Sequence, residues 1–345
     1  MKKVLLFFLS ASLLLSEGAF AQKQKLSVED AVIGQWRELY PETLSRLSWI
    51  PETDSYFYLE GKKLQKQQVH SDEPQTIMTL RELNQTLGLT DKDQQLGYFP
   101  RFSWLDRETI RFKFNNTWYQ VNLEKPALIQ ETKIDEQAQN EDFSGASDYF
   151  AYTKANNLYL ASFTGDSRQI TDESNSGIVC GQEVHRREFG IHTGTFWSPG
   201  GKKLAFYRKD ETMVTDYPLV DVTSRVAEYQ PEKYPMAGME SHHVTIGVYD
   251  LQSEKTLYLN TGKPADQYLT SVTWGPDGKF IYVAVLNRDQ DHLKLNKYSA
   301  QDGSLVQTLF EEKDERYVEP QMPLIFLPDH PDQFIWMSRR DGFNH

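Results

Sequence analysis

The segment Thr195–Tyr207, with the sequence TFWSPGGKKLAFY, contains the clearest structural signal of the chain. Its Ser-Pro-Gly-Gly tetrapeptide combines residue types that favour a tight turn, and it separates two short runs that contain aromatic residues. In the second run, Leu204 and Phe206 alternate with Ala205 and Tyr207, which is typical of a strand. The segment therefore predicts a β-hairpin.

Similar strand-turn-strand units recur along the chain, and Val272–Val283 (VTWGPDGKFIYV) is the clearest second copy. The aromatic positions expected to be equivalent are Trp49, Trp104, Phe150, Trp197, Trp274 and Phe326. A period of roughly 50 residues with four short strands per unit is typical of β-propeller blades, which bury their faces against one another. The alternative, a β-sandwich, would place strands about every 8–12 residues without this long period.

The sequence thus predicts an all-β fold, a β-propeller with an incomplete set of four-stranded blades and short helical insertions. About five to six blades are expected, the last one incomplete. Ser27–Asp30 has the spacing of a capping box and predicts a short helix that ends near Leu39. Thr79–Glu82 predicts a second helix, which Gly88 should end. The longest gap between units leaves room for an insertion at Asp210–Gly238, where prolines disfavour regular structure.

The N-terminus resembles a bacterial secretory signal peptide. Lys2-Lys3 precedes an apolar run over Val4–Leu15, and Ala19-Phe20-Ala21 fits a cleavage site. We therefore expect residues 1–21 to be a signal peptide, 22–45 a helical segment and 46–345 the propeller. We therefore expect the protein to be exported to the periplasm or cell surface of a bacterium and to have no membrane span after cleavage. The alternative is that the segment stays uncleaved as a membrane anchor.

Composition excludes several classes of function. The net charge of −12 and the lack of a basic block argue against nucleic acid as a partner. Cys180 is the single cysteine, so an intrachain disulfide is excluded. The sequence contains no Gly-x-Ser-x-Gly, P-loop or His-Glu-x-x-His motif. His242 and His243 are adjacent, and neighbours on a strand point to opposite faces, so one metal should not bind both. No catalytic residue, metal ligand or cofactor is predicted.

A charge cluster precedes the hairpin and is the best candidate for a binding site. Glu188 is preceded by four charged or titratable residues, Glu183, His185, Arg186 and Arg187, and is followed by the apolar residues Phe189 and Ile191. Two hypotheses apply to Glu188. Its carboxylate could bind a ligand, or it could form a structural ion pair with Arg186 or Arg187.

Several blocks of the sequence resemble one family. Val179–Tyr207 is similar to the N-terminal propeller of the dipeptidyl peptidase IV branch of the prolyl oligopeptidase family, in particular the bacterial prolyl tripeptidyl aminopeptidases. Further similar blocks are Tyr234–Gly238, Ser241–Thr245, Tyr317–Pro320, Phe334–Trp336 and Ser338–His345. In that family, an eight-bladed propeller caps a C-terminal α/β-hydrolase domain with a Ser-Asp-His triad and admits only unstructured peptides.

The resemblance implies a role for Glu188. In the family, a glutamate between blades binds the free α-amino group of the substrate, and Glu188 matches its position. The dipeptidyl peptidases usually have two glutamates in tandem there, whereas this chain has Arg187 before Glu188. This departure favours the tripeptidyl type over the dipeptidyl type.

The function implied by the resemblance is that of the substrate-gating, N-terminus-recognising propeller of an exported proline-specific serine aminopeptidase. The implied partners are peptides with a free N-terminus and a C-terminal hydrolase domain, with homodimerisation of the full-length protein left open. The sequence stops at residue 345 before any such domain, so we expect a truncated polypeptide without peptidase activity of its own. The alternative is a stand-alone periplasmic propeller that acts as a binding module.

Overall fold

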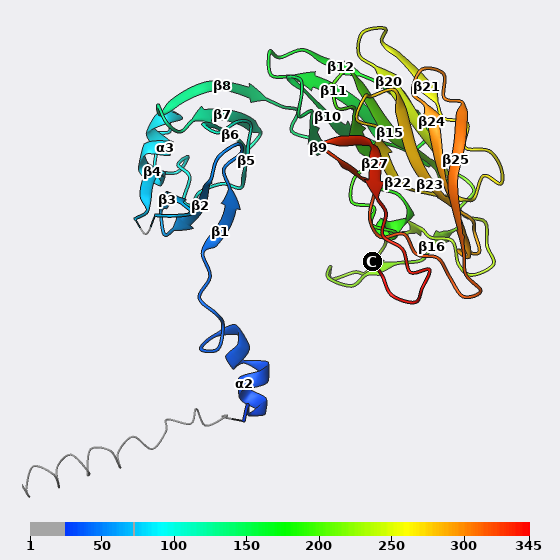
Figure 1. Cartoon of the computed structure of the whole chain (residues 1–345), viewed down its shortest axis with the longest axis horizontal. Coiled ribbons are helices and arrows are strands. Elements are labelled where there is room, and N and C mark those ends of the chain that lie inside the picture. Colours follow the sequence, from blue (N-terminus) through cyan, green and yellow to red (C-terminus); the bar gives the residue numbers. More distant parts are fainter. Residues whose placement is uncertain (1–24, 72) are drawn as a thin grey trace, which may run out of the picture. The chain divides into compact units, whose positions relative to one another are not determined.

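A computed structural model of the chain describes residues 25–71 and 73–345 (Figure 1). The expected signal peptide lies outside these residues. The chain divides into two compact units, one of Met1–Trp49 with Asp54–Thr76 and one of Ile50–Thr53 with Ile77–His345. These are called unit 1 and unit 2 below, and each is described by itself.

Unit 1 begins with the predicted capping box. The backbone N–H of Asp30 donates to Ser27 Oγ at 3.0 Å, and helix α2 (Val28–Val32) is followed by the 3₁₀ helix η1 (Gly34–Trp36). The α-helix is shorter than expected, because none of its residues is buried and packing does not favour its continuation. Strands β1 (Ser45–Trp49), β2 (Ser55–Glu60) and β3 (Lys63–Gln68) then pair in antiparallel fashion. With β4 (Gln75–Thr79) they form a sheet in the order β1-β2-β3-β4.

Unit 2 contains helix α3 (Leu80–Thr86), whose capping box joins Thr79 and Glu82 as predicted. Sequential antiparallel sheets follow, which confirms the all-β propeller class. The strands of the next two sheets are β5 (Phe102–Trp104), β6 (Thr109–Phe114), β7 (Thr117–Asn122) and β8 (Ala127–Lys133), then β9 (Gln139–Phe143), β10 (Tyr149–Lys154), β11 (Asn157–Ser162) and β12 (Ser167–Gln169).

The remaining sheets of unit 2 hold the quoted hairpin and its second copy. One sheet contains β13 (Ile178–Cys180), β14 (Thr195–Trp197), β15 (Lys203–Asp210), β20 (His243–Asp250) and β21 (Lys255–Tyr258). The next contains β22 (Tyr268–Trp274), β23 (Phe280–Leu286), β24 (His292–Ser299) and β25 (Leu305–Lys313), and β26 (Ile325–Leu327) pairs with β27 (His330–Ile335). The predicted hairpin is confirmed, since β14 pairs with β15 across the Ser-Pro-Gly-Gly turn.

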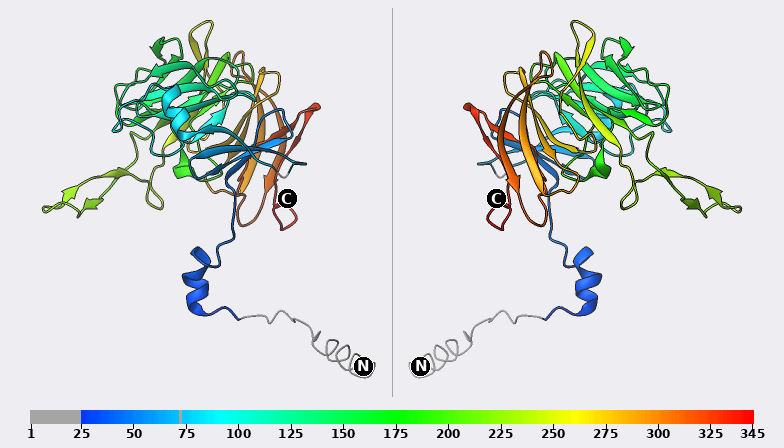
Figure 2. Two further views of the ribbon diagram at one scale, coloured as in Figure 1. Left: turned by 90° about the vertical axis from the view of Figure 1, so that its left-hand side faces the viewer. Right: turned by 90° about the vertical axis from the view of Figure 1, so that its right-hand side faces the viewer.

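The predicted insertion forms an arm between β15 and β20. These two strands pair directly, from Lys203 with Asp250 to Asp210 with His243, so the residues between them leave the sheet. The arm consists of two short ladders, β16 (Asp216–Tyr217) with β19 (Glu232–Lys233) and β17 (Val220–Asp221) with β18 (Glu228–Tyr229). Figure 2 shows the arm extending away from the sheets of unit 2.

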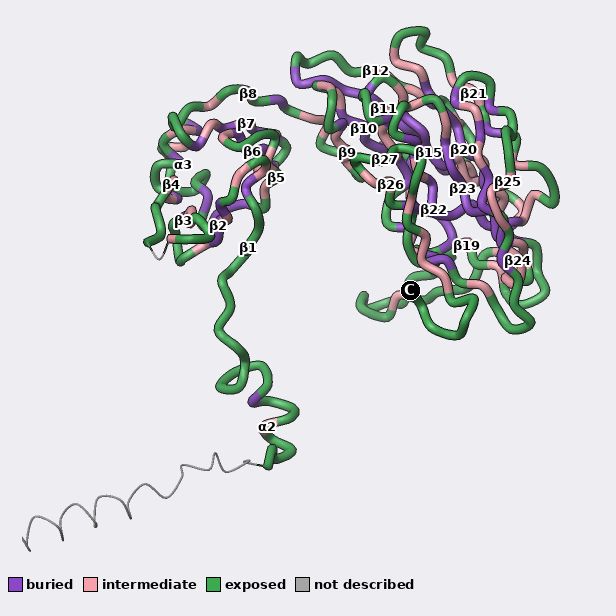
Figure 3. Tube along the Cα trace, in the orientation of Figure 1, coloured by how far each residue is buried: buried purple, intermediate pink, exposed green. Residues whose placement is uncertain are grey.

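Neighbouring sheets of unit 2 pack face to face. Leu158 of β11 shares one core cluster with Phe206 of β15, and Ile246 of β20 shares another with Leu269 and Ile281 of the next sheet. Figure 3 shows buried positions along the strands of these sheets, in particular β15, β20, β22 and β23. Each sheet therefore buries apolar side chains against the next, as the repeat predicts.

The pairing of strands corrects one member of the predicted repeat. In five sheets, one strand ends in an aromatic residue that pairs with an apolar or aromatic residue of the strand after the turn: Trp49 with Tyr56, Trp104 with Ile110, Phe143 with Phe150, Trp197 with Leu204 and Trp274 with Ile281. The equivalent of the tryptophans is thus Phe143, and the assignment to Phe150 was wrong. Phe150 lies in the second strand, and the connecting residues 144–148 lack the combination of proline and glycine that marks the turns after Trp197 and Trp274.

Two of these tryptophans connect neighbouring sheets through their indole nitrogens. Trp197 Nε1 donates to the carbonyl oxygen of Asp142 at 3.2 Å, and Trp274 Nε1 donates to that of Phe196 at 2.8 Å. In both cases the acceptor lies on the corresponding strand of the preceding sheet, β9 for Asp142 and β14 for Phe196. The aromatic repeat therefore has a polar role between sheets as well as an apolar one.

We expect Trp274→Phe to lower the free energy of unfolding by about 1–2 kcal/mol, because the carbonyl of Phe196 loses its donor. Chemical denaturation followed by circular dichroism measures the change. Trp36→Phe is the control, since Trp36 is exposed and should have little effect. Equal unfolding midpoints for the two variants would contradict the proposed role of the indole.

Candidate functional site

The backbone between β13 and β14 follows an unusual path around Glu188. His185, Arg186 and Arg187 form a tight turn, η2, with φ angles of 52°, 53° and 65°. Glu188 returns to φ −70°, and Phe189 is again left-handed at 57°. Each left-handed residue other than glycine costs roughly 1 kcal/mol, and such strain is typical of functional sites.

Buried side chains hold this turn in place. Val184, His185, Phe189 and Ile191 are all buried, whereas Glu188 between them is exposed. Phe189 packs against Tyr268 of β22, with ring centroids 5.0 Å apart. The apolar residues that flank the predicted charge cluster are therefore its anchors, and they present Glu188 at the surface.

The structural alternative for Glu188 is contradicted by the pairing of both arginines with other residues. Arg187 Nε donates to Glu183 Oε1 at 2.8 Å. Arg186 Nη1 donates to Glu232 Oε1 of the arm at 3.0 Å, and its guanidinium lies over the ring of Tyr234. The carboxylate of Glu188 makes no hydrogen bond or ion pair with any residue that the structure describes.

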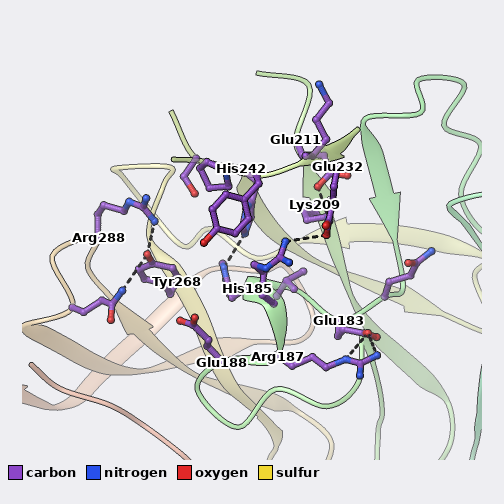
Figure 4. Close-up of a pocket in the computed structure, with 18 residues that line it drawn as sticks. Glu183, His185, Arg187, Glu188, Lys209, Glu211, Glu232, His242, Tyr268 and Arg288 are labelled. Carbon is purple, nitrogen blue, oxygen red and sulfur yellow. Dashed lines mark hydrogen bonds and ion pairs between the residues drawn. The ribbon is translucent and has the colours of Figure 1, made fainter. Parts of the chain in front are cut away.

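Glu188 lines a cavity of about 640 Å³ within unit 2. The walls come from the turn, from the end of β15, from the arm, and from Tyr268 and Arg288 near the ends of β22 and β23 (Figure 4). Glu188 also borders a second cavity of about 560 Å³, which Tyr317 and Glu319 help to line. An unpaired carboxylate at such a position can accept hydrogen bonds from a cationic ligand.

Two histidines that are distant in sequence meet at the wall of the larger cavity. His242 Nε2 lies 2.9 Å from His185 Nδ1, and the two rings stack with centroids 5.0 Å apart. The backbone N–H of Leu269 donates to His185 Nε2 at 3.4 Å, so the hydrogen on the His185 ring belongs to Nδ1 and points to His242. His242 therefore contacts His185 across the cavity wall, a contact the adjacency of His242 and His243 does not predict.

Burial keeps both histidines neutral. It lowers the pKa of His185 well below its usual value and that of His242 to about 4, and the nearby charges of Lys209 and Arg288 act in the same direction. A neutral pair can form the Nδ1–H···Nε2 hydrogen bond that supports the strained turn. Within the described part of the chain, no three His, Cys, Asp or Glu side chains cluster in a way that could hold a metal ion.

This pair predicts that acid destabilises the fold. A histidine in the unfolded chain has a pKa near 6.5, whereas the pKa of His242 in the folded chain is about 4. Between these values the unfolded state binds more protons, so the free energy of unfolding should fall as the pH drops from about 6.5 to about 4. Urea denaturation at a series of pH values should show that the free energy of unfolding falls less steeply with pH in His242→Gln than in the wild type. His330 is exposed, so His330→Gln is the control. If both variants changed the pH dependence equally, the role of the histidine pair would be refuted.

These features define a class of protein, a β-propeller with a charged cavity that presents an unpaired carboxylate. A family model for the dipeptidyl peptidase IV N-terminal region matches residues 99–345. The chain belongs to this family.

Curated relatives are longer than this chain. A Talaromyces marneffei protein named dipeptidyl-aminopeptidase B is 29% identical over an alignment of 231 positions, which covers 59% of this chain and 26% of that protein. A Coccidioides posadasii protein of the same name is 26% identical over an alignment of 361 residues, which covers 96% of this chain and 36% of the relative. The chain spans about a quarter to a third of the length of these relatives.

Two solved structures are similar over most of the chain. A Bacteroides ovatus protein described as a dipeptidyl aminopeptidase IV has a TM-score of 0.79 and 42% identity, over 88% of this chain and 42% of that one. Porphyromonas gingivalis dipeptidyl peptidase 4 has a TM-score of 0.70 at 18% identity, over 93% of this chain and 47% of that one, and shows the shared fold. Among residues 25–71 and 73–345, no helix combines the length and apolar character that crossing a membrane requires.

Proposed function

We propose that the chain recognises the free amino terminus of peptides and serves as the substrate-gating propeller of a proline-specific serine aminopeptidase. The observation that carries this proposal is the unpaired carboxylate of Glu188, held at the rim of a cavity by a strained and buried turn. Membership of the family supports it, because the relatives are named as aminopeptidases.

The physical chemistry of Glu188 suits an ammonium group. A carboxylate and an ammonium about 4 Å apart attract each other by roughly 4 kcal/mol at an effective dielectric constant near 20. Desolvation offsets much of this energy, so the contact would set the position of the peptide more than its affinity. Arg187 is turned toward Glu183, which leaves the Glu188 carboxylate available to such a ligand.

Isothermal titration calorimetry with the chain as it stands tests the recognition step. A free Ala-Ala-Pro peptide should bind about tenfold more tightly than its N-acetylated form, as expected for a charge-assisted hydrogen bond. Equal affinity for the two peptides would refute the proposal.

The catalytic part of the proposal places bond cleavage in a C-terminal α/β-hydrolase domain, which the propeller would cover. The chain alone should then bind peptides without hydrolysing them. Labelling with a fluorophosphonate should leave this polypeptide unmodified, and a labelled serine would overturn the assignment. Export to the periplasm or cell surface, the tripeptidyl type of specificity and cleavage after residue 21 belong to the same proposal, and mass spectrometry of the secreted protein tests the last of these.

A further inference from the structure

The charged side chains around the larger cavity form pairs, with two exceptions. The basic residues are Arg186, Arg187, Lys209, Lys233 and Arg288, and the acidic ones are Glu183, Glu188, Glu211 and Glu232. Arg186 pairs with Glu232, Arg187 with Glu183, Lys209 with Glu211 and Lys233 with Asp216 of the arm. Within the described residues, Glu188 and Arg288 alone among these have no partner of opposite charge.

Arg288 is held in a defined position without an acidic partner. It lies two residues beyond the end of β23, where its guanidinium stands 5.5 Å from the centroid of the Tyr268 ring. Its Nη1 donates to the Tyr268 hydroxyl, which also accepts a hydrogen bond from Gln290. The other N–H groups of Arg288 make no hydrogen bond with a described residue, and their planar arrangement matches a carboxylate.

Tyr268 brings the two unpaired charges onto one wall. Its ring packs against Phe189, the residue after Glu188, and its hydroxyl binds Arg288. In Figure 4, Glu188 and Arg288 lie on opposite sides of Tyr268. The wall therefore presents a negative and a positive group with one aromatic side chain between them.

We propose that Arg288 is a specificity-determining residue that binds the side-chain carboxylate of an acidic first residue of the peptide. The inference rests on the proposed function, in which Glu188 binds the ammonium group. An aspartate or glutamate at the amino terminus carries both charges on one residue and complements the two unpaired groups. A neutral first residue leaves Arg288 without a partner in the bound state.

Four peptides separate the two contacts in calorimetric titrations of the chain. They are Asp-Ala-Pro-Leu and the isosteric Asn-Ala-Pro-Leu, each with a free and an acetylated N-terminus. The free Asp peptide should bind about tenfold more tightly than the free Asn peptide. Arg288→Gln should reduce this preference to less than about twofold.

Two further variants test whether the effect of Arg288→Gln on peptide affinity comes from a general loss of positive charge or of folded protein. Arg316→Gln removes one exposed positive charge that does not line the cavity, and it should preserve the preference for Asp. Tyr268→Phe retains the ring but removes the hydroxyl that positions Arg288, so it should weaken the preference. A preference that survives both Arg288→Gln and Tyr268→Phe would overturn the inference.

The outcomes distinguish this inference from the function on which it rests. If the free Asn peptide binds more tightly than the acetylated one but the free Asp peptide binds no more tightly than the free Asn peptide, only the proposed role of Arg288 is wrong. If acetylation does not change the affinity of the Asn peptide, the proposed role of Glu188 is wrong. Absence of binding for all four peptides overturns both.

Discussion

Gly190→Ala should destabilise unit 2 by roughly 3 kcal/mol, which places it among the more damaging single substitutions. Gly190 has φ +70°, a conformation that costs an alanine about 1 kcal/mol. A Cβ atom at this position would lie 2.0 Å from the backbone oxygen of Gln321. Because the clash is with backbone, no side-chain rotation relieves it, and either the turn or the segment around Gln321 must move.

Gly88→Ala is a matched control for this prediction. Gly88 has the same φ of +70°, but a Cβ atom there would meet nothing within 4 Å. Its substitution therefore isolates the backbone cost of about 1 kcal/mol. Urea denaturation of both variants measures the difference, and equal losses of stability would contradict the close approach of Gly190 to Gln321.

The turn at residues 185–190 shows where prediction from sequence reaches its limit. The repeat of aromatic residues and turns predicts most strands of unit 2, because local alternation and turn chemistry determine them. The three consecutive left-handed residues have no such signal, since His185, Arg186 and Arg187 are common in ordinary loops. Their conformation depends on contacts with His242 and Tyr268, which follow from the packing of one sheet on the next.

The arginine pairs around Glu188 illustrate the same limit. Proximity in sequence suggested that Arg186 or Arg187 neutralises Glu188. In the folded chain, Arg186 pairs with Glu232 of the arm, which is 46 positions away in the sequence. The strained turn directs Arg187 back to Glu183. Arg288 could not be recognised as a candidate at all, because only tertiary structure reveals that it lacks an acidic partner near the same cavity.

Glu188→Gln should abolish discrimination between free and acetylated peptides. In the wild-type chain, we expect a free Ala-Ala-Pro peptide to bind about tenfold more tightly than the acetylated form. Glutamine retains the size of the side chain and one carbonyl acceptor but removes the charge, so affinity for the free peptide should fall to that for the acetylated one. Because Glu188 is exposed and has no partner among the described residues, the substitution should leave the unfolding midpoint unchanged.

Glu183→Gln is the control for a change of charge in the same cluster. Glu183 already pairs with Arg187, so its loss should affect the position of that arginine but spare the preference for a free N-terminus. If both variants reduced this preference equally, the general potential of the cavity would account for it. A preference lost in Glu188→Gln and retained in Glu183→Gln would instead assign the ammonium contact to one carboxylate, since a diffuse electrostatic effect does not distinguish between two glutamates at the rim of one cavity.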